Sequence, residues 1–264
     1  MRIRANNPGP MTLTGTNTYV LTSQDDTSAV LIDPGPEMAE HRQAFLAEVA
    51  DRDLTAIVLT HQHADHSEML GSIEQWAPEV PVYAVLERFA RHTDPVADGD
   101  EIAFGSTPAD VLRVVATPGH TSDSISLIHA GALYSGDTIL GEGTTIVTHP
   151  EGSLRDYLNS LDRLRELLDA GEFAIIEPAH GERIDAPAEV IDYYRSHRLE
   201  RIEQVKAALE QGASTASEVC DIVYHDVDPS VRPAAEQIVK AQLAYLDALP
   251  ADGAWVPSLA PGLQ

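Results

Sequence analysis

Short apolar runs separated by turn residues fill most of the first 135 positions, and they predict β-strands. The runs lie at 18–23, 29–33, 56–60, 82–85, 111–115, 125–128 and 132–135. Residues 34–36, Pro-Gly-Pro, interrupt this pattern. Residues 37–50 carry Phe45, Leu46 and Val49 at helical spacing, which predicts a helix between two of the strands.

An amphipathic stretch at 154–170 predicts a longer helix. Ser153 and Asp156 have the spacing of a helix N-cap, and Gly171 is suited to end the helix. One more strand is predicted at 173–176. The pattern up to this point is therefore α/β, with polar, glycine-containing loops at the ends of the strands.

Beyond about residue 186 the pattern predicts only helices, at 189–211, 216–224 and 231–249, followed by a short β-hairpin at 250–257. Thr215 and Glu218 predict a capping box for the second of these helices. Asp228 and Pro229 suit the start of the third. We therefore expect a catalytic domain at 1–188 and a small helical domain at 189–264.

Composition narrows the class of protein. The 264 residues include a single cysteine, Cys220, which excludes an intramolecular disulfide framework. The longest apolar run, 82–86, is far too short to span a membrane, and the first eight residues lack an apolar signal segment. These features predict a cytoplasmic protein with no membrane partner. Its net charge of −25 would repel a nucleic acid unless a local basic patch held it.

Three histidines and an aspartate lie within one hexapeptide, His61-Gln-His63-Ala-Asp65-His66. Two histidines that leave a strand two residues apart point their imidazoles the same way. Three further residues, His120, Asp137 and His180, each follow an apolar run. Imidazoles and carboxylates together suit Zn²⁺, Mn²⁺ or Fe²⁺, so the sequence predicts a metal site built from strand ends.

The hexapeptide resembles the His-x-His-x-Asp-His motif of the metallo-β-lactamase superfamily, and the likeness covers about the first 190 residues. In more detail the chain resembles the β-lactamase-like protein 2 (LACTB2-like) branch, through residues 7–19, 136–145 and Ser-His-Arg at 196–198. The resemblance implies an αββα sandwich with its metals at the edge between two sheets. It also implies a small C-terminal helical, winged-helix-like domain.

Carried over by position, the resemblance implies that His61, His63 and His120 hold one metal. Asp65, His66 and His180 would hold the other, and Asp137 would bridge the two. Two zinc ions are expected; manganese remains open, as does a single iron of the kind found in related persulfide dioxygenases. Asp65 would also orient the bridging hydroxide, which makes it the expected catalytic residue.

Weaker predictions concern residues around this site. Asp33 is predicted to hydrogen-bond a ligand histidine, although a plain turn role before Pro34 explains it equally well. His149, His197 and Arg198 are predicted to line the substrate cleft, with surface or capping roles as the alternative.

The leading functional hypothesis is a hydrolase whose metal-bridging hydroxide attacks a small ester or thioester. The resemblance offers a single-stranded RNA endoribonuclease as the alternative, but only Arg155, Arg183, Arg195 and Arg198 are near the predicted site loops. A non-enzymatic winged-helix binding protein would leave the complete ligand set without a role. We expect a small acyl substrate as the partner and a monomer or homodimer.

Overall fold

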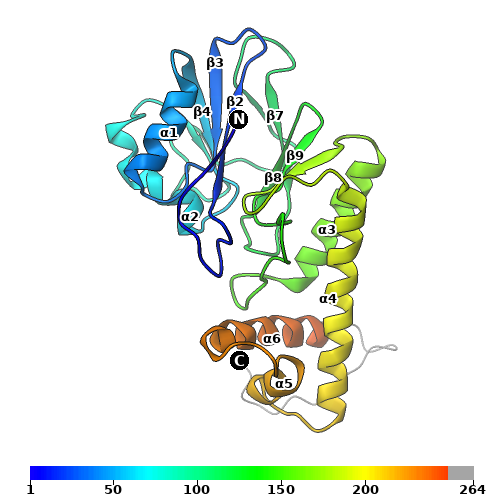
Figure 1. The fold of residues 1–264 in the computed structure, drawn as a ribbon. Helices are drawn as coiled ribbons and strands as arrows, with labels where there is room; N and C mark the ends of the chain where they lie inside the picture. The colour runs from blue at the N-terminus through cyan, green and yellow to red at the C-terminus, as the bar shows by residue number, and fades with distance from the viewer. Residues whose placement is uncertain (249–264) are drawn as a thin grey trace.

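Two five-stranded sheets face each other in the computed structural model, which describes residues 1–248 (Figure 1). The first sheet has the order β1 (Arg2–Arg4), β2 (Asn17–Thr22), β3 (Ser28–Ile32), β4 (Asp53–Val58) and β5 (Val82–Tyr83). The second has the order β10 (Ile175–Glu177), β9 (Ala132–Tyr134), β8 (Ile125–His129), β7 (Val111–Ala116) and β6 (Glu101–Ala103). The pairs β3–β4, β4–β5 and β9–β10 are parallel, and the other pairs are antiparallel.

Helices cover the outer face of each sheet (Figure 1). The first sheet packs against α1 (Ala39–Val49) and the 3₁₀ helix η1 (Glu68–Gln75), which follows the short α2 (Ala64–Ser67). The second sheet packs against α3 (Leu154–Asp169) and α4 (Pro187–Glu210). Fully buried side chains such as Val30, Val58, Leu112 and Leu127 fill the space between the sheets. The predicted αββα sandwich is confirmed.

Local signals in the sequence set where the helices begin and end. The Ser153 hydroxyl accepts a hydrogen bond from the Asp156 amide at the start of α3. Gly171 follows α3 with φ of 77°, a conformation that costs glycine little. The capping box of Thr215 and Glu218 is formed at the start of α5 (Ala216–Val223). These three predictions are confirmed.

The C-terminal helices continue the core of the second sheet. The first half of α4 packs on α3, while its second half packs on α5 and α6 (Arg232–Asp247). One apolar cluster runs from Leu133 through Tyr157 and Ile202 to Leu246. None of the helices in residues 1–248 is both long and apolar enough to cross a membrane.

Two details of the C-terminal prediction need comment. Asp228 and Pro229 do not start the third helix: Pro229–Val231 forms a 3₁₀ turn, η2, and α6 begins at Arg232. The hairpin predicted at 250–257 lies outside the described residues. Within 1–248, only helices follow β10, so the winged-helix character of this part stays a prediction.

Candidate metal centre

All seven predicted ligands meet at one edge of the sandwich, because each lies shortly beyond the C-terminal end of a strand. The hexapeptide follows β4 and forms the start of α2, and the remaining ligands follow β7, β9 and β10. His120 sits in a tight turn after Gly119, whose φ is 140°. A Cβ on Gly119 would lie 2.3 Å from the Cα of Tyr157, so glycine lets α3 support this turn directly.

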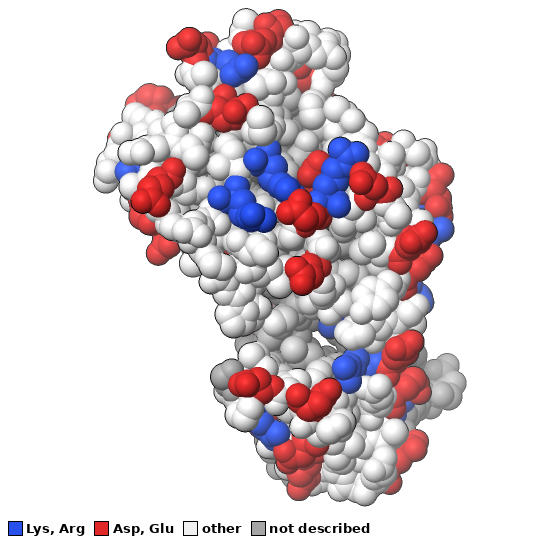
Figure 2. Space-filling view, viewed as in Figure 1, with Lys and Arg blue, Asp and Glu red and all other residues white. Residues whose placement is uncertain are grey.

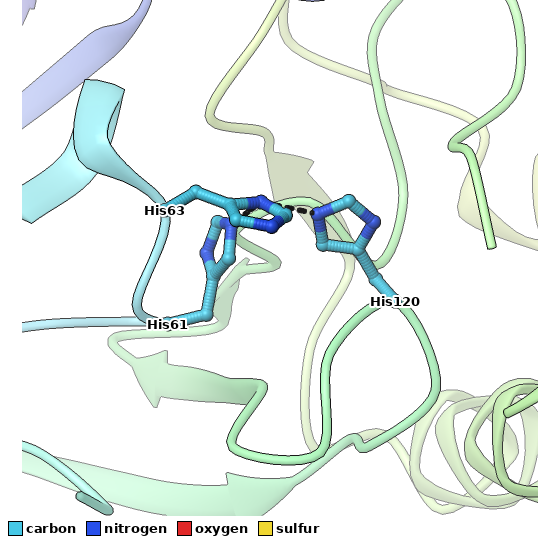
Figure 3. Close-up of side chains that lie close together, drawn as sticks. All are labelled: His61, His63 and His120. Carbon is cyan, nitrogen blue, oxygen red and sulfur yellow. Dashed lines mark hydrogen bonds between the residues drawn. The ribbon is translucent and has the colours of Figure 1, made fainter. Parts of the chain in front are cut away.

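Three imidazoles form the first group (Figure 3). The Nδ1 of His63 lies 3.0 Å from the Nε2 of His61 and 3.0 Å from the Nε2 of His120. Two nitrogen ligands of a tetrahedral zinc ion, each about 2.0–2.1 Å from the metal, are about 3.3 Å apart. The spacing of these nitrogens is therefore close to that of a metal site.

Backbone carbonyls fix the orientation of two of the imidazoles. The Nδ1 of His120 lies 2.7 Å from the carbonyl oxygen of Ile146, and the Nδ1 of His180 lies 3.3 Å from that of Gly15. A carbonyl only accepts hydrogen bonds, so each Nδ1 carries the proton. In the neutral ring, each Nε2 then presents its lone pair to the centre.

Side-chain acceptors orient the other three imidazoles in the same way. The Nδ1 of His66 lies 2.8 Å from Oδ2 of Asp33, and the Nδ1 of His61 lies 3.1 Å from the hydroxyl of Thr60. That hydroxyl donates to Asp33 at 2.7 Å, so it can only accept from His61. Glu151 lies 3.3 Å from the outer nitrogen, Nε2, of His63. In the neutral rings, all five inward nitrogens would therefore offer their lone pairs to the centre.

The second group contains buried polar atoms that no described residue satisfies. The Nε2 atoms of His66 and His180 and the Oδ1 of Asp137 are buried without a hydrogen-bond partner. The Nε2 of His66 lies 3.5 Å from Oδ1 of Asp137, and the Nε2 of His180 lies 3.3 Å from the same oxygen. Oδ2 of Asp65 lies 3.4 Å from His66 and 3.3 Å from His180. Unpaired buried polar atoms are costly, whereas a cation among them would satisfy all of them at once.

Asp137 faces both groups. Its Oδ1 points to His66 and His180, while its Oδ2 lies 3.6 Å from the Nε2 of His120. The structure thus places one carboxylate oxygen toward each group, so Asp137 could contribute to holding a cation in either. The residues fit a two-metal centre.

The electrostatics of the centre favour positive charge. Burial alone would lower the pKa of His66, but the carboxylates of Asp65, Asp137 and Asp33 outweigh it and raise that pKa well above its usual value. Burial opposes ionisation of Asp65 and Asp137, yet the neighbouring imidazoles hold both pKa values far below the ordinary range. Both carboxylates are therefore ionised at neutral pH, and a metal cation would compete with the proton for His66.

The three residues predicted to line the substrate cleft lie in different surroundings. His149 lines a cavity of about 350 Å³ between the start of α3 and α6. The ring of His197 stacks on that of Tyr193. Arg198 is only 5% exposed, lies over the ring of Tyr157 and donates to the carbonyl of Thr145. Contact of any of the three with a substrate stays a prediction.

Several residues that orient the proposed metal ligands were not predicted from the sequence. They are Thr60, which joins Asp33 to His61; Glu151, which faces His63; Thr16, which donates to Asp65; and Asn7, which donates to Thr16. A lone threonine or glutamate in a loop has no local pattern that reveals such a role. Residues 7–19 are part of the resemblance to the family branch, but that resemblance implies no contact between them and the ligands.

Comparisons with known proteins agree with this geometry. The profile of the Metallo-beta-lactamase superfamily matches residues 11–170. A "Beta-lactamase-like protein 2 homolog" of Caenorhabditis elegans is 37% identical over 265 residues, covering 93% of this chain and 83% of the relative. An "Atrochrysone carboxyl ACP thioesterase" of Aspergillus fumigatus is 28% identical, covering 85% and 73%. A metallo-beta-lactamase family protein of Thermus thermophilus has a similar fold, with a TM-score of 0.76 at 22% identity, covering 93% and 92%.

The family profile spans more than half of the chain, and the nematode relative aligns along nearly all of it. The chain belongs to the metallo-β-lactamase superfamily, in its β-lactamase-like protein 2 branch.

Proposed function

We propose that this superfamily hydrolase cleaves small esters or thioesters with the help of two divalent metal ions. His61, His63 and His120 would hold one ion, Asp65, His66 and His180 the other, and Asp137 both. The observation that carries the proposal is the inward orientation of all five imidazoles, fixed by acceptors on their outer nitrogens. A merely structural cluster would not need five imidazoles whose inner nitrogens face one centre beside two ionised carboxylates.

Zinc is the metal we propose, because imidazoles make up five of the seven proposed ligand side chains. Manganese and iron accept the same ligands and are alternatives that elemental analysis distinguishes. Two such ions supply a nucleophile at neutral pH, by lowering the pKa of a water, and stabilise the charge that develops on the attacked oxygen.

Asp65 is the residue we propose to orient the attacking water. Its side chain is 25% exposed, whereas that of Asp137 is 10% exposed and that of His66 is fully buried. Because its pKa is far below the ordinary range, Asp65 is a poor base but a permanent hydrogen-bond acceptor. It can therefore hold a water by one proton and direct its lone pair at a carbonyl carbon.

The basic side chains support a small acyl substrate rather than RNA. Arg183 and Arg195 pair with Asp185 and Asp162 at 2.7 and 2.6 Å. Arg155 and Arg198 donate to backbone carbonyls. On the face shown in Figure 2, basic side chains lie beside acidic ones rather than along one continuous stripe.

A phosphodiester backbone needs several free cations near the reacting bond, and these four arginines are already engaged. An ester or thioester needs far fewer such contacts. The relative from Aspergillus fumigatus is named as a thioesterase, which is consistent with this class of substrate.

The test compares two substrates on the same metal-loaded protein. We expect an acyl thioester to be hydrolysed faster than an unstructured oligoribonucleotide at physiological salt. Any RNA cleavage should fall steeply as salt is added, because few screened contacts would hold the strand. Asp137→Asn serves as the control, since it should abolish hydrolysis of either substrate by the centre. Faster, salt-tolerant RNA cleavage that this variant abolishes would make RNA the substrate instead.

A further inference from the structure

The loop at 7–17, which ends at the first residue of β2, touches two ligands of the second group. Thr16 reaches Asp65, and the carbonyl of Gly15 accepts from His180. The outer nitrogens of the three-histidine group face Thr60, Ile146 and Glu151 instead, which belong to other loops. Asp33 and Thr60 together reach both groups, through His66 and His61, whereas the contacts of the loop at 7–17 go to the second group.

Thr16 holds Asp65 through a directed hydrogen bond. The fully buried Thr16 hydroxyl lies 2.9 Å from Oδ2 of Asp65, the oxygen that also faces His66 and His180. The side-chain amide of Asn7 donates to the same hydroxyl at 3.0 Å, and its carbonyl oxygen accepts from the Thr16 amide at 2.9 Å. Since the hydroxyl accepts from Asn7, its single proton is available for Asp65.

The neighbours of Thr16 hold the segment that carries His180. The Asn17 side chain donates to the carbonyls of Pro178 and Gly181, both at 2.9 Å, and its backbone amide donates to Ala179 at 2.7 Å. Gly15 has φ of 127°, and a Cβ there would lie 2.1 Å from the Ala5 carbonyl oxygen. Only glycine therefore lets this loop turn and present its carbonyl to His180.

We propose that Asn7 and Thr16 are positioning residues for the Asp65–His66–His180 half of the centre, and that the loop at 7–17 decides whether the second metal is held. This inference rests on the two-metal centre proposed above. Thr16 fixes the direction of the Asp65 carboxylate while leaving its remaining lone pairs free to bind a cation. Loss of the hydroxyl should release that carboxylate and weaken one metal selectively.

The experiment measures zinc binding rather than turnover. Metal-free wild-type, Thr16→Val, Thr16→Ser and Thr14→Val proteins are titrated with zinc against a colorimetric chelator. Thr14 is the matched control, because it lies on the same loop but its exposed hydroxyl accepts from Arg4. Removing a partner behind a metal ligand typically weakens metal binding by about 10–100-fold. We expect a loss of this size for one of two zinc equivalents in Thr16→Val, and wild-type binding in Thr16→Ser and Thr14→Val.

Double variants identify which of the two zinc equivalents is bound more weakly. Adding Thr16→Val to His180→Ala should weaken binding no further, because both act on the same half. Adding it to His63→Ala should impair both equivalents. Wild-type affinities in Thr16→Val, or an equal loss at both sites, would overturn the role of the loop while leaving the two-metal centre intact. A wild-type protein that binds fewer than two equivalents would overturn the centre, and this inference with it.

Discussion

His66 donates the proton on its Nδ1 to Oδ2 of Asp33 over 2.8 Å, and both side chains are almost fully buried. Asp33 also accepts two hydrogen bonds from Thr60, from its amide and its hydroxyl, both at 2.7 Å. All three of these groups, on His66 and Thr60, donate hydrogen bonds to the Asp33 carboxylate. Asp33 therefore joins the end of β3 to the loop after β4 and to α2, and it fixes the tautomer of a proposed metal ligand.

Replacing Asp33 by Asn should weaken metal binding. The Asn NH₂ group must face either the Thr60 amide or the Thr60 hydroxyl and His66, so at least one donor meets a donor. We expect about 10–100-fold weaker zinc binding in a chelator competition. Asp110 provides the control, because it is equally buried and accepts from Gln24 and Thr107 in a similar way. Asp110→Asn should lower stability but leave the zinc affinity unchanged; equal effects of the two variants would refute the role of Asp33.

Removal of metal should destabilise the fold. The inward atoms of His66, His180 and Asp137 are buried and have no hydrogen-bond partner within residues 1–248. A ligand present at 100 times its dissociation constant stabilises the folded state by about 2.7 kcal/mol. We therefore expect a chelator to lower the melting temperature and zinc to restore it, as measured by calorimetry. The calcium-loaded chelator is the control, and a melting temperature insensitive to chelation would contradict a resident metal.

His41, outside the centre, should make the fold sensitive to acid. Its Nε2 donates to the Thr18 hydroxyl at 2.7 Å, because that hydroxyl itself donates to the Asp33 carbonyl, and its Nδ1 is buried without a partner. Burial lowers the pKa of His41 to about 4. An unfolded chain, with a histidine pKa of about 6.5, binds the proton first as the pH falls. The stability contributed by neutral His41 is thus present above pH 6.5 and is lost as the pH falls toward 4.

The test compares His41→Gln with the wild type in urea unfolding of metal-free protein. Between pH 7 and pH 5 the wild type should lose about 2 kcal/mol more free energy of unfolding than the variant does. Subtracting the two proteins removes the contribution of the other histidines. Parallel pH dependences would show that His41 keeps an ordinary pKa.

Cutting the chain after residue 186 should impair the catalytic part. The cut removes α4, whose Tyr194 hydroxyl accepts from the buried Leu140 amide at 2.9 Å. It also exposes the apolar face of α3, including Leu161 and Leu164. We expect the 1–186 fragment to aggregate in light scattering, whereas a 1–248 fragment should stay monodisperse. A soluble, active 1–186 fragment would support an independent catalytic domain at 1–188.

The order of the main helices and strands was predictable because apolar periodicity and capping residues are local signals. The strands β1 and β6 were not predicted, since three-residue segments such as Arg2–Arg4 and Glu101–Ala103 are too short and too polar to show a period. The misplaced start of the last helix has a similar cause. Asp228 and Pro229 are compatible with a 3₁₀ turn as well as with an α-helix, and packing decides between them.

The ligand residues stood out because their chemistry is concentrated in a hexapeptide and at strand ends. Among the residues that orient them, Asp33 was predicted and does contact His66, whereas Asn7, Thr16 and Glu151 were not, because they act across long stretches of sequence. The surroundings of Arg198 were not predictable either. The fold buries it against the Thr145 carbonyl, a contact that its sequence position does not reveal, and its predicted contact with a substrate stays a prediction.

The contact of Arg198 with Thr145 links α4 to the loop that contains Thr145 and Ile146. Arg198 lies midway along α4, whose second half packs on α5 and α6, and it donates a hydrogen bond to the carbonyl of Thr145. The next residue, Ile146, supplies the acceptor for His120. Two adjacent peptide units therefore join the C-terminal helices to an imidazole of the centre: one is held by Arg198, and the other orients His120.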